Sequence, residues 1–477
     1  MKKNITIAIA LFCMIAIGEG CKKFLDVNKD PNHTVSVGES LQLGPIEKTM
    51  AGNTVAGECA AAATYWTQQV SINQPPPTLE TYEIFPADVD GTWSYAVYPN
   101  IFENLKIMIA QAEAAGHNQY VAIGKTLYAF NLAVTTDFWN DIPYSQANSP
   151  AYTKPKYDSQ ESIYHAIQSL LDSALIYVAR PASAVAPSTD DFIYGGDMGK
   201  WKRFIYTLKA RYYLRLSKAP GRTATAQADS ALVALQNGFA ANSDNATIAY
   251  AGSANDQNPW YGGTLPGAGG VVIAKFLVDG LIANSDPRLP VIANVNSGGT
   301  YSGRASGADP VPDYTVYSTI GSFFGGSLPL DPNNVSGASA SLIVSTYSEA
   351  LFIKAEATFI KQGAAAAEPV YQAAIASDLS LLGVSTADQA TYLGSRPVLT
   401  AGNGLQQIMY EKYVTDFLSI EAYDDWRRTG FPVLSLAQNA FVQYIPRRFP
   451  YPSSELLANP QPQQSATIAD RVWWDAQ

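Results

Sequence analysis

Apolar residues recur every three or four positions along much of the chain, and this spacing predicts amphipathic α-helices. One apolar stripe covers residues 100–115, where Asn100 and Glu103 form a capping box and Gly116 supplies a stop. A second stripe runs over residues 120–134. Because so few residues separate the two stripes, they predict a helical hairpin with a very short connection.

The same pattern returns further along the chain. Asp158 with Glu161 begins a helix that extends to Val178, and Asp197 begins another that extends to Leu216. Helix pairs in units of about 35–40 residues are typical of tetratricopeptide-type arrays, which stack into superhelices. We therefore predict a mostly α fold, a tetratricopeptide-like α/α superhelical scaffold of helical hairpins with long irregular ligand-binding loops and little β-structure. Further helices are predicted over residues 223–237, 347–362, 368–383 and 405–420, with Gly363 between the second and the third.

Between residues 240 and 340 the composition changes to Gly, Pro, Ser and Asn with scattered aromatic residues. One short helix is predicted there, from Val271 to Leu281. Structureless stretches of this length are unusual inside compact domains, so we interpret this one as an insert of ordered functional loops. The predicted single domain covers residues 41–477, with scaffold at about 41–239 and 341–440, the loop-rich insert at about 240–340 and an irregular C-terminal segment at 441–477.

The N-terminus predicts export. Two lysines precede an apolar run from Ile5 to Ile17, which is too short to span a bilayer as a helix but is typical of a signal peptide. We therefore assign residues 1–20 to a signal peptide, Cys21 to lipid attachment and residues 21–40 to a lipid-anchored tether. The alternative is a soluble secreted protein that is cut nearby, in which Cys21 is a chance thiol.

Cysteine content and charge exclude several classes of function. With Cys13 in the signal peptide and Cys21 lipidated, Cys59 is alone and is interpreted as a small buried thiol. The chain carries a formal charge of −10, and removal of residues 1–20 takes away two Lys and one Glu, which leaves −11. An acidic chain gains nothing from releasing counterions from phosphates, which argues against nucleic acid as a partner. It also argues against electrostatic attachment to an anionic membrane, so the lipid would provide the attachment.

The sequence lacks the usual motifs of catalysis. His33, His117 and His165 are the only histidines, and none has HExxH spacing. The chain also has no GxSxG elbow, no Walker loop and no Gly-rich dinucleotide turn that opens a helix. We therefore predict no catalytic residue, no metal ligand and no cofactor, although the sequence leaves open whether an ion such as calcium is bound.

One charged cluster near the C-terminus, in EAYDDWRRTGFP, invites a catalytic interpretation. It comprises Asp424, Asp425, Trp426, Arg427 and Arg428. A glycosidase needs two carboxylates on either side of a bond, roughly 5–10 Å apart. Adjacent aspartates diverge on a helix, and the neighbouring arginines lower their pKa values and disfavour an acid role. We interpret the cluster as a structural ion-pair corner that holds the end of the last long helix against the preceding hairpins.

Aromatic residues in loops are better candidates for function. A sugar ring packs its C–H groups on an aromatic face, while its hydroxyls need amide and carboxyl partners. Loop tyrosines and tryptophans beside Asn, Gln and Asp supply both kinds of contact. The alternative for each residue is that it covers the hydrophobic side of its own loop. The predicted ligand-binding residues are Tyr65, Trp66, Tyr82, Trp93, Trp260 and Tyr261.

Several segments together resemble the SusD/RagB family of surface lipoproteins from Bacteroidota. The resemblance covers nearly the whole chain and runs in order behind the signal peptide and cysteine. It rests on the segments CKKFLDVNKDPN, DFWNDIPYSQA, DFIYGGDMGKWKRFIYTLKARYYLRLS, YSEALFIKAEA, EKYVTDFLSIEAYDDWRRTGFPVL and IPRRFPYPSSELLANP.

The resemblance implies a helical tetratricopeptide-like scaffold whose loops hold the ligand. It implies a cell-surface lipoprotein of the outer membrane that captures a glycan, or in some members a peptide, and delivers it to a TonB-dependent SusC-like transporter. It also implies that the protein is not an enzyme. Two other classes stay open: a glycoside hydrolase, and an adaptor whose helical array binds only protein.

Overall fold

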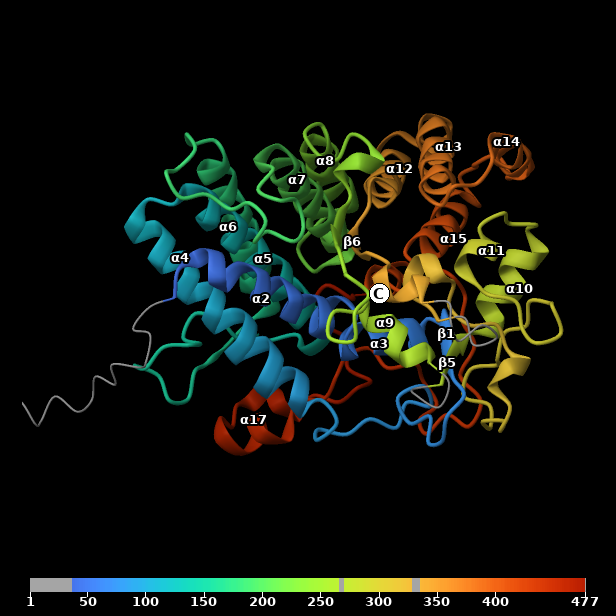
Figure 1. Cartoon of the computed structure of the whole chain (residues 1–477), viewed down its shortest axis with the longest axis horizontal. Coiled ribbons are helices and arrows are strands. Elements are labelled where there is room, and N and C mark those ends of the chain that lie inside the picture. Colours follow the sequence, from blue (N-terminus) through green and yellow to red (C-terminus); the bar gives the residue numbers. More distant parts are fainter. Residues whose placement is uncertain (1–36, 266–269, 328–334, 477) are drawn as a thin grey trace, which may run out of the picture.

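Helical hairpins form the scaffold of the protein, so the predicted fold class is confirmed (Figure 1). The computed structural model describes residues 37–265, 270–327 and 335–476. The predicted signal peptide, Cys21 and the tether as far as residue 36 lie outside these residues. The scaffold helices are α2 (Glu39–Met50), α3 (Glu58–Trp66), α4 (Asn104–Ala115), α5 (Asn118–Trp139), α6 (Gln160–Val178), α7 (Met198–Arg215), α8 (Ala224–Leu235), α12 (Tyr347–Gln362), α13 (Ala364–Leu381), α14 (Thr386–Ser395), α15 (Gly404–Thr415) and α16 (Glu421–Thr429).

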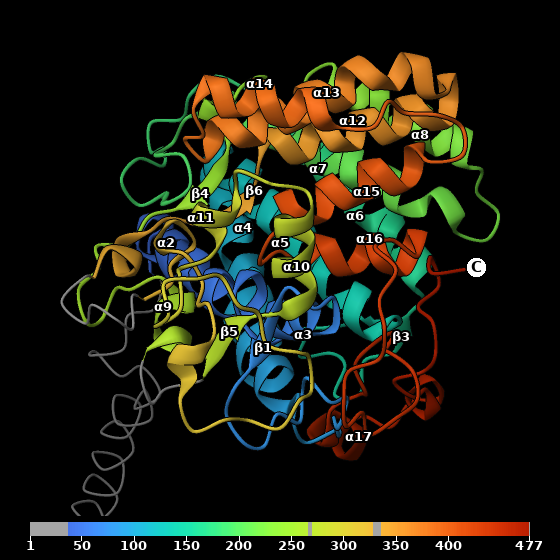
Figure 2. The same cartoon turned by 90° about the vertical axis from the view of Figure 1, so that its right-hand side faces the viewer.

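The helical array is continuous in space although the loop-rich insert interrupts it in the sequence. Each of α4, α5, α6, α7 and α8 packs against the next, and α8 then packs against α12, which packs against α13. Figure 1 shows α6, α7, α8, α12 and α13 following one another from left to right, and Figure 2 shows α12, α13 and α14 as one layer above α15 and α16. The insert therefore leaves the array after α8 and rejoins it at the neighbouring helix.

The insert contains short elements rather than structureless chain. The strands of the described residues form three separate two-stranded sheets, and each of these sheets is antiparallel. β1 (Val70–Ile72) pairs with β5 (Val271–Ile273), β2 (Ile142–Pro143) with β3 (Tyr157–Asp158), and β4 (Ala246–Ile248) with β6 (Leu342–Ser345). The insert helices are α9 (Pro259–Thr264), α10 (Lys275–Ala283) and α11 (Leu289–Ile292), with 3₁₀ turns η4 (Asn242–Asp244), η5 (Tyr314–Val316), η6 (Ser322–Phe324) and η7 (Ser336–Ser339). Outside the insert lie π-helical η1 (Ala51–Val55) and η2 (Thr92–Glu103), α17 (Ser453–Ala458), and 3₁₀ turns η3 (Leu216–Lys218) and η8 (Pro462–Ser465).

One predicted helix starts earlier than the capping pattern suggests. The π-helical segment η2 runs directly into α4, so Asn100 and Glu103 lie inside a continuous helix. The predicted capping box is therefore wrong, because the preceding turn already supplies helical hydrogen bonds. Gly116 does end α4, with a φ of 74° that glycine adopts without steric penalty.

Three other boundaries differ from the predictions. The hydroxyl of Ser159, rather than Asp158, caps α6 by accepting from a backbone N–H of the first turn. The helix predicted from Val271 is instead strand β5 followed by α10, because its first residues pair with β1. The last long helix ends at Thr415, and the charged cluster forms a separate helix, α16. Asp197 caps α7 as predicted.

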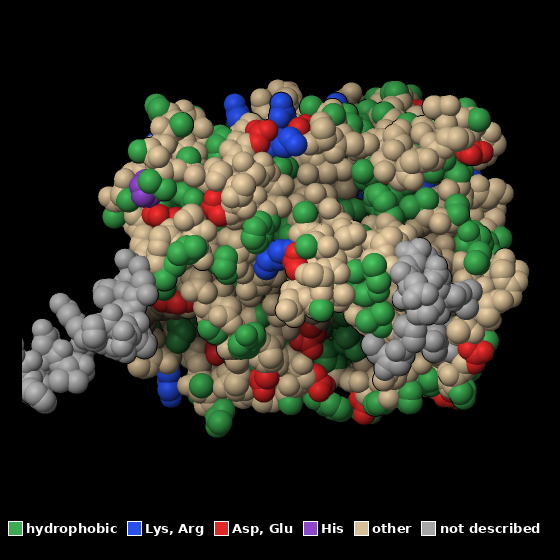
Figure 3. All heavy atoms as spheres, viewed as in Figure 1, with side chains coloured by type: hydrophobic (Ala, Val, Ile, Leu, Met, Phe, Trp, Pro, Cys, Tyr) green, Lys and Arg blue, Asp and Glu red, His purple; other side chains and the backbone are tan. Residues whose placement is uncertain are grey.

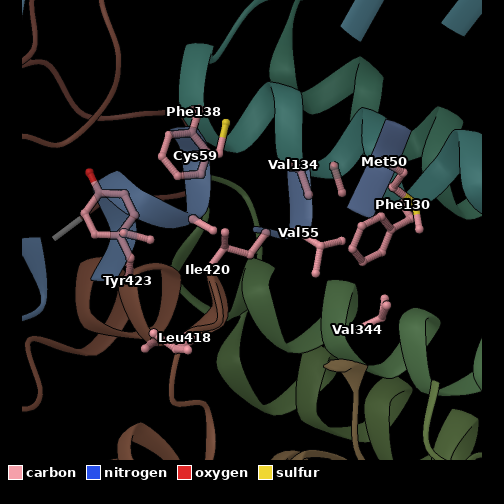
Figure 4. Packing of buried hydrophobic residues seen from close by; sticks show 14 of the residues in the cluster. Met50, Val55, Cys59, Phe130, Val134, Phe138, Val344, Leu418, Ile420 and Tyr423 are labelled. Atoms are coloured by element: carbon pink, nitrogen blue, oxygen red, sulfur yellow. The ribbon is translucent and has the colours of Figure 1, made fainter. Parts of the chain in front are cut away.

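A hydrophobic core joins the start of the chain, the scaffold and the C-terminal segment. Figure 4 shows Met50 and Val55 from the first helices near Phe130 and Val134 of α5, and Cys59 of α3 beside Phe138 of the same helix α5. Residues of α16 and the loop before it close the same core. Cys59 is a buried free thiol, and burial raises its pKa well above the ordinary value. No helix of the described chain has the length and apolarity needed to cross a membrane.

Candidate ligand-binding site

Two of the six predicted aromatic residues belong to one aromatic cluster in the interior. Trp66 ends α3 and is fully buried, and its indole N–H donates to the carbonyl of Leu79 at 2.9 Å. Phe449 lies edge-on to both Trp66 and Trp139, with ring centroids 5.6 and 5.2 Å apart, and Trp139 in turn lies edge-on to Trp93 at 5.4 Å. The C-terminal segment therefore packs on the scaffold through these rings, and in this conformation they offer almost no surface to a ligand.

The two predicted tyrosines of the N-terminal half are also buried. Tyr65 lies beside Trp66 in the core of α3. Tyr82 has a φ of 67°, and its hydroxyl accepts a hydrogen bond from the backbone N–H of Ala437 at 3.0 Å. Burial raises the pKa of Tyr82 to about 12, so its phenol stays neutral. This contact fixes the loop after α3 to the C-terminal segment.

Trp260 and Tyr261 lie on α9 and are buried as well. Asn258 caps this helix through its side chain, which accepts from the backbone N–H of Trp260 at 2.9 Å. Trp260 lines a small cavity of about 30 Å³, and its indole N–H has no partner among the described residues. Ser341 and Ile343 line this cavity and also an open groove on the far side of β6. The sequence prediction thus found a segment near an open groove, but neither Trp260 nor Tyr261 lines that groove.

The open groove, which we name the loop groove, has a volume of about 480 Å³. Its floor is the β4–β6 pair, in which Thr247 lies opposite Ile343. Its walls come from η6, η7 and the C-terminal end of α13. The lining residues are Asn245, Thr247, Ser322, Phe323, Ser336, Ser339, Ala340, Ser341, Ile343 and Leu381.

Phe323 provides an exposed aromatic face at the rim of the loop groove. Its side chain is 38% exposed and lies edge-on to Phe324 at a centroid distance of 5.0 Å. Phe324 is buried and lies edge-on to Phe417 at 5.0 Å. The exposed ring is therefore supported from below by the scaffold, which limits its movement.

The segments that carry the groove are fixed to one another by backbone and amide contacts. The backbone N–H of Asn258 donates to the carbonyl of Ala338 at 2.9 Å, and its side-chain amide donates to the carbonyl of Ala340 at 3.1 Å. Gly325, with a φ of 89°, passes so close to Asn258 that an added Cβ would lie 2.4 Å from the amide carbon. Only glycine fits this crossing, so α9, η6 and η7 form one packed unit.

A smaller pocket of about 160 Å³ lies between the β1–β5 pair and the segment around residue 311. The Asn73 side chain closes one wall, because it donates to the carbonyl of Val311 at 3.0 Å and accepts from the N–H of the same residue at 2.9 Å. Gln74 and Thr264 add polar groups. This small pocket has no exposed aromatic ring among its lining residues, in contrast to the loop groove.

Figure 3 shows where apolar side chains reach the surface. They form patches on the right-hand half of this face, where Figure 1 places α9, β1, β5, α10 and α11. Lys and Arg side chains are few there. This character favours a neutral ligand with apolar faces over a nucleic acid or a strongly charged polymer.

The charged cluster of α16 lies inside the scaffold rather than in a groove. Arg428 pairs with Asp425 at 2.7 Å and also with Glu356 of α12. Lys412 of α15 pairs with Asp425 at 2.6 Å. Arg427 pairs with Asp424. Ion pairs therefore join α16 to α12 and α15, and they leave no open space between the two aspartates.

A further basic residue connects this cluster to the first half of the scaffold. Arg215 of α7 is buried and pairs with Asp137 of α5 and Glu421 of α16, each at 2.5 Å, and with Asp424. Burial raises the pKa of Asp137 to about 7, although Arg215 opposes this shift. Burial alone would raise the pKa of Asp425 as well. The positive charges of Lys412 and Arg428 have the larger effect and lower that pKa.

Comparison with known proteins agrees with this architecture. A family model described as "Starch-binding associating with outer membrane" matches residues 31–452. A solved chitin-binding protein is similar with a TM-score of 0.77 at 23% identity, over 92% of this chain and 100% of its own. A SusD/RagB family protein from Bacteroides thetaiotaomicron has a TM-score of 0.75 at 24% identity, over 92% and 99% of the two chains.

A third similar structure is a chitin-binding SusD homologue from Flavobacterium johnsoniae. It has a TM-score of 0.73 at 20% identity, over 91% of this chain and 98% of its own. At these identities the three structures establish a shared fold. No curated protein matches the sequence.

Proposed function

This chain belongs to the SusD-like family, described as starch-binding and associating with the outer membrane, and from that premise we propose that it captures a glycan at the cell surface without cleaving it. We place the sugar in the loop groove. The observation that carries this placement is the exposed face of Phe323 beside hydroxyl and amide groups. A pyranose ring would lie on the phenyl face and exchange hydrogen bonds with the serines, Thr247 and Asn245.

The lining of the groove supports binding rather than catalysis. Hydrolysis of a glycosidic bond uses two carboxyl groups on either side of that bond. Neither Asp nor Glu is among the described residues that line the loop groove. A hydrolase at this position would lack both an acid and a nucleophile.

Two parts of the proposal concern the cell rather than the groove. We propose that Cys21 carries the lipid that attaches the protein to the outer membrane, at the cell surface. We further propose that the glycan passes to a TonB-dependent SusC-like transporter. Family membership supports both, and the predicted signal peptide supports the first.

The proposal still includes the six aromatic residues that were predicted from the sequence. Trp260 lines the cavity that shares Ser341 and Ile343 with the loop groove, so its indole could support the groove floor from behind. Direct contact of the six rings with a ligand stays a prediction, because it requires an opening of the loops that bury them.

Peptide capture is the main alternative within the same transport role. The loop groove offers no charged side chain for a peptide terminus among its described lining, which favours a neutral saccharide.

Affinity electrophoresis of the chain from residue 22 onward, through gels that contain single polysaccharides, tests the proposal. We expect retardation by at least one neutral polysaccharide, with no release of reducing ends on prolonged incubation. Reducing-end release would establish a hydrolase. If no polysaccharide retards the protein, while a peptide mixture or the transporter alone binds it in calorimetry, glycan capture is wrong.

A further inference from the structure

A second open groove lies on the helical scaffold, away from the insert. We name it the scaffold groove. It has a volume of about 390 Å³ and lies between α4, α5, α6 and the loop that follows β2. It shares no lining residue with the loop groove. The lining residues are Lys106, Ile109, Ala110, Glu113, Lys125, Tyr128, Tyr144, Ser145, Ala147 and Leu170.

Two half-buried tyrosines give the scaffold groove an aromatic wall. The rings of Tyr128 and Tyr144 lie edge-on with centroids 6.2 Å apart. Phe102 stacks behind Tyr128 at 4.9 Å and an interplanar angle of 25°, so this ring is held in place. Neither phenol oxygen has a hydrogen-bond partner among the described residues. Burial raises the pKa of both tyrosines, so both phenols are neutral and can donate.

The cations of the scaffold groove are not fully neutralised. Lys125 forms an ion pair with Glu113 at 2.8 Å and donates to the hydroxyl of Ser173 at 3.1 Å. Lys106 donates to the backbone carbonyls of Ala147 at 3.3 Å and Asn148 at 2.5 Å, and within the described chain it has no carboxylate partner. An ammonium group has three donors, so Lys106 keeps one for a ligand together with its charge.

The free hydrogen-bonding groups are mostly donors. Glu113 is the only carboxylate in the described lining, and it already accepts from Lys125 and from the hydroxyl of Tyr177 at 3.3 Å. Glu103, at the end of η2, is a nearby carboxylate outside the lining, and its charge contributes to the raised pKa of Tyr128. The lining therefore offers two phenol O–H groups and one ammonium N–H to a ligand rich in acceptors.

We propose that the scaffold groove binds a saccharide unit that carries a carboxylate, such as a uronic acid. The sugar ring lies against the two tyrosines, and its carboxylate accepts from Lys106 and from a phenol hydroxyl. The ligand class rests on the proposed glycan function, but the site itself is separate. A polysaccharide with acidic units would then be held at two points, and the second contact would increase its retention without any change in the loop groove.

Isothermal titration calorimetry with the chain from residue 22 onward tests the site, with trigalacturonic acid as probe and neutral galactotriose as the matched ligand. Lys106→Ala removes the charge, Tyr144→Phe removes only a hydroxyl, and Lys106→Arg restores a donor. Lys202→Ala changes the net charge equally, at an exposed lysine of α7 that forms no ion pair within the described chain. Phe323→Ala alters the loop groove and therefore shows whether the acidic ligand binds there instead.

We expect the acidic ligand to bind about threefold to tenfold more weakly to Lys106→Ala and about threefold more weakly to Tyr144→Phe. Lys106→Arg, Lys202→Ala and Phe323→Ala should bind it as the unaltered protein does. Added salt should weaken binding to the unaltered protein more than to Lys106→Ala.

The proposal is overturned if Lys106→Ala and Lys202→Ala bind the acidic ligand equally, or if Phe323→Ala alone loses it. It is also overturned if the unaltered protein binds neutral polysaccharides but no acidic ligand, a result that leaves the proposed function intact. If the unaltered protein binds no saccharide of either kind, both the proposed function and this site are wrong.

Discussion

Truncation of Phe323 to alanine should weaken glycan binding. A phenylalanine side chain presents roughly 200 Å² of surface. The 38% exposed fraction of Phe323 therefore corresponds to about 75 Å² that a sugar can cover. At about 25 cal/mol per Å², complete coverage contributes about 2 kcal/mol, and coverage of one half contributes about 1 kcal/mol. We therefore expect binding to weaken between about fivefold and about 25-fold.

Calorimetry with an oligosaccharide of the polysaccharide that retards the protein in gels measures this effect. Phe323→Trp should bind at least as well as the unaltered protein, because it retains and enlarges the flat face. Phe85→Ala is the matched control, since Phe85 is 48% exposed but does not line the loop groove. A thermal melt of Phe323→Ala shows whether the variant is folded at the temperature of the titration, because the packed part of its ring also contributes stability.

Two outcomes would refute the placement in the loop groove. If Phe323→Ala binds normally while Gln74→Ala binds poorly, the sugar occupies the small pocket beside β1 and β5. If Phe85→Ala weakens binding as much as Phe323→Ala, the effect comes from the general apolar surface.

Three further changes test the interior. Burial raises the pKa of Glu58 to about 7, so the stability from its protonated form is present below about pH 4.5 and is lost as the pH rises through 7. Glu58→Gln should therefore reduce the loss of stability between pH 5 and pH 8 by about 2 kcal/mol relative to the unaltered protein, measured by urea unfolding, whereas the exposed Glu161→Gln should not. Arg428→Met leaves the buried Glu356 without its partner and takes one of two cationic partners from Asp425, so it should lower the free energy of unfolding by about 3–5 kcal/mol. Arg222→Met at an exposed pair should lower it by less than about 1 kcal/mol, and equal losses would contradict the buried network. Trp66→Phe removes a buried hydrogen bond and should lower the melting temperature with glycan affinity unchanged, and a normal melting temperature with reduced affinity would show instead that this ring binds the ligand.

Helical periodicity predicted the scaffold well because the helices are amphipathic. The pattern around residues 120–134 corresponds to α5, and the Gly116 and Asp197 signals mark a real end and a real start. One predicted boundary failed because the competing interaction came from elsewhere in the chain. Val271 lies in a strand because β1 pairs with it, and no local pattern contains that partner.

The site residues were harder to predict because exposure in a loop depends on tertiary packing. Trp66 and Trp260 are among the six aromatic residues that the sequence suggested for sugar binding, and the fold buries both. Large aromatic side chains stabilise a core more than any other, so composition alone favours their burial. The pair Phe323 and Phe324 carries a weak signal, since two adjacent phenylalanines between glycines in a short turn cannot both point inward.

The position of Phe323 depends on charges far from the groove. Arg288, next to α11, is fully buried and donates to Asp378 of α13 at 2.9 Å and to Glu411 of α15 at 2.5 Å. It therefore fixes the edge of the insert to the scaffold. α11 packs against η6, and the N–H of Gly321, the residue before η6, donates to the carbonyl of Ile292 at 2.8 Å.

The loop groove takes lining residues from η6 and from the end of α13, and Arg288 connects the elements behind both. A buried cation with two or more carboxylates contributes little net stability, because desolvation offsets the attraction, but it permits few alternative arrangements. We infer that this charge cluster serves to set the width of the groove.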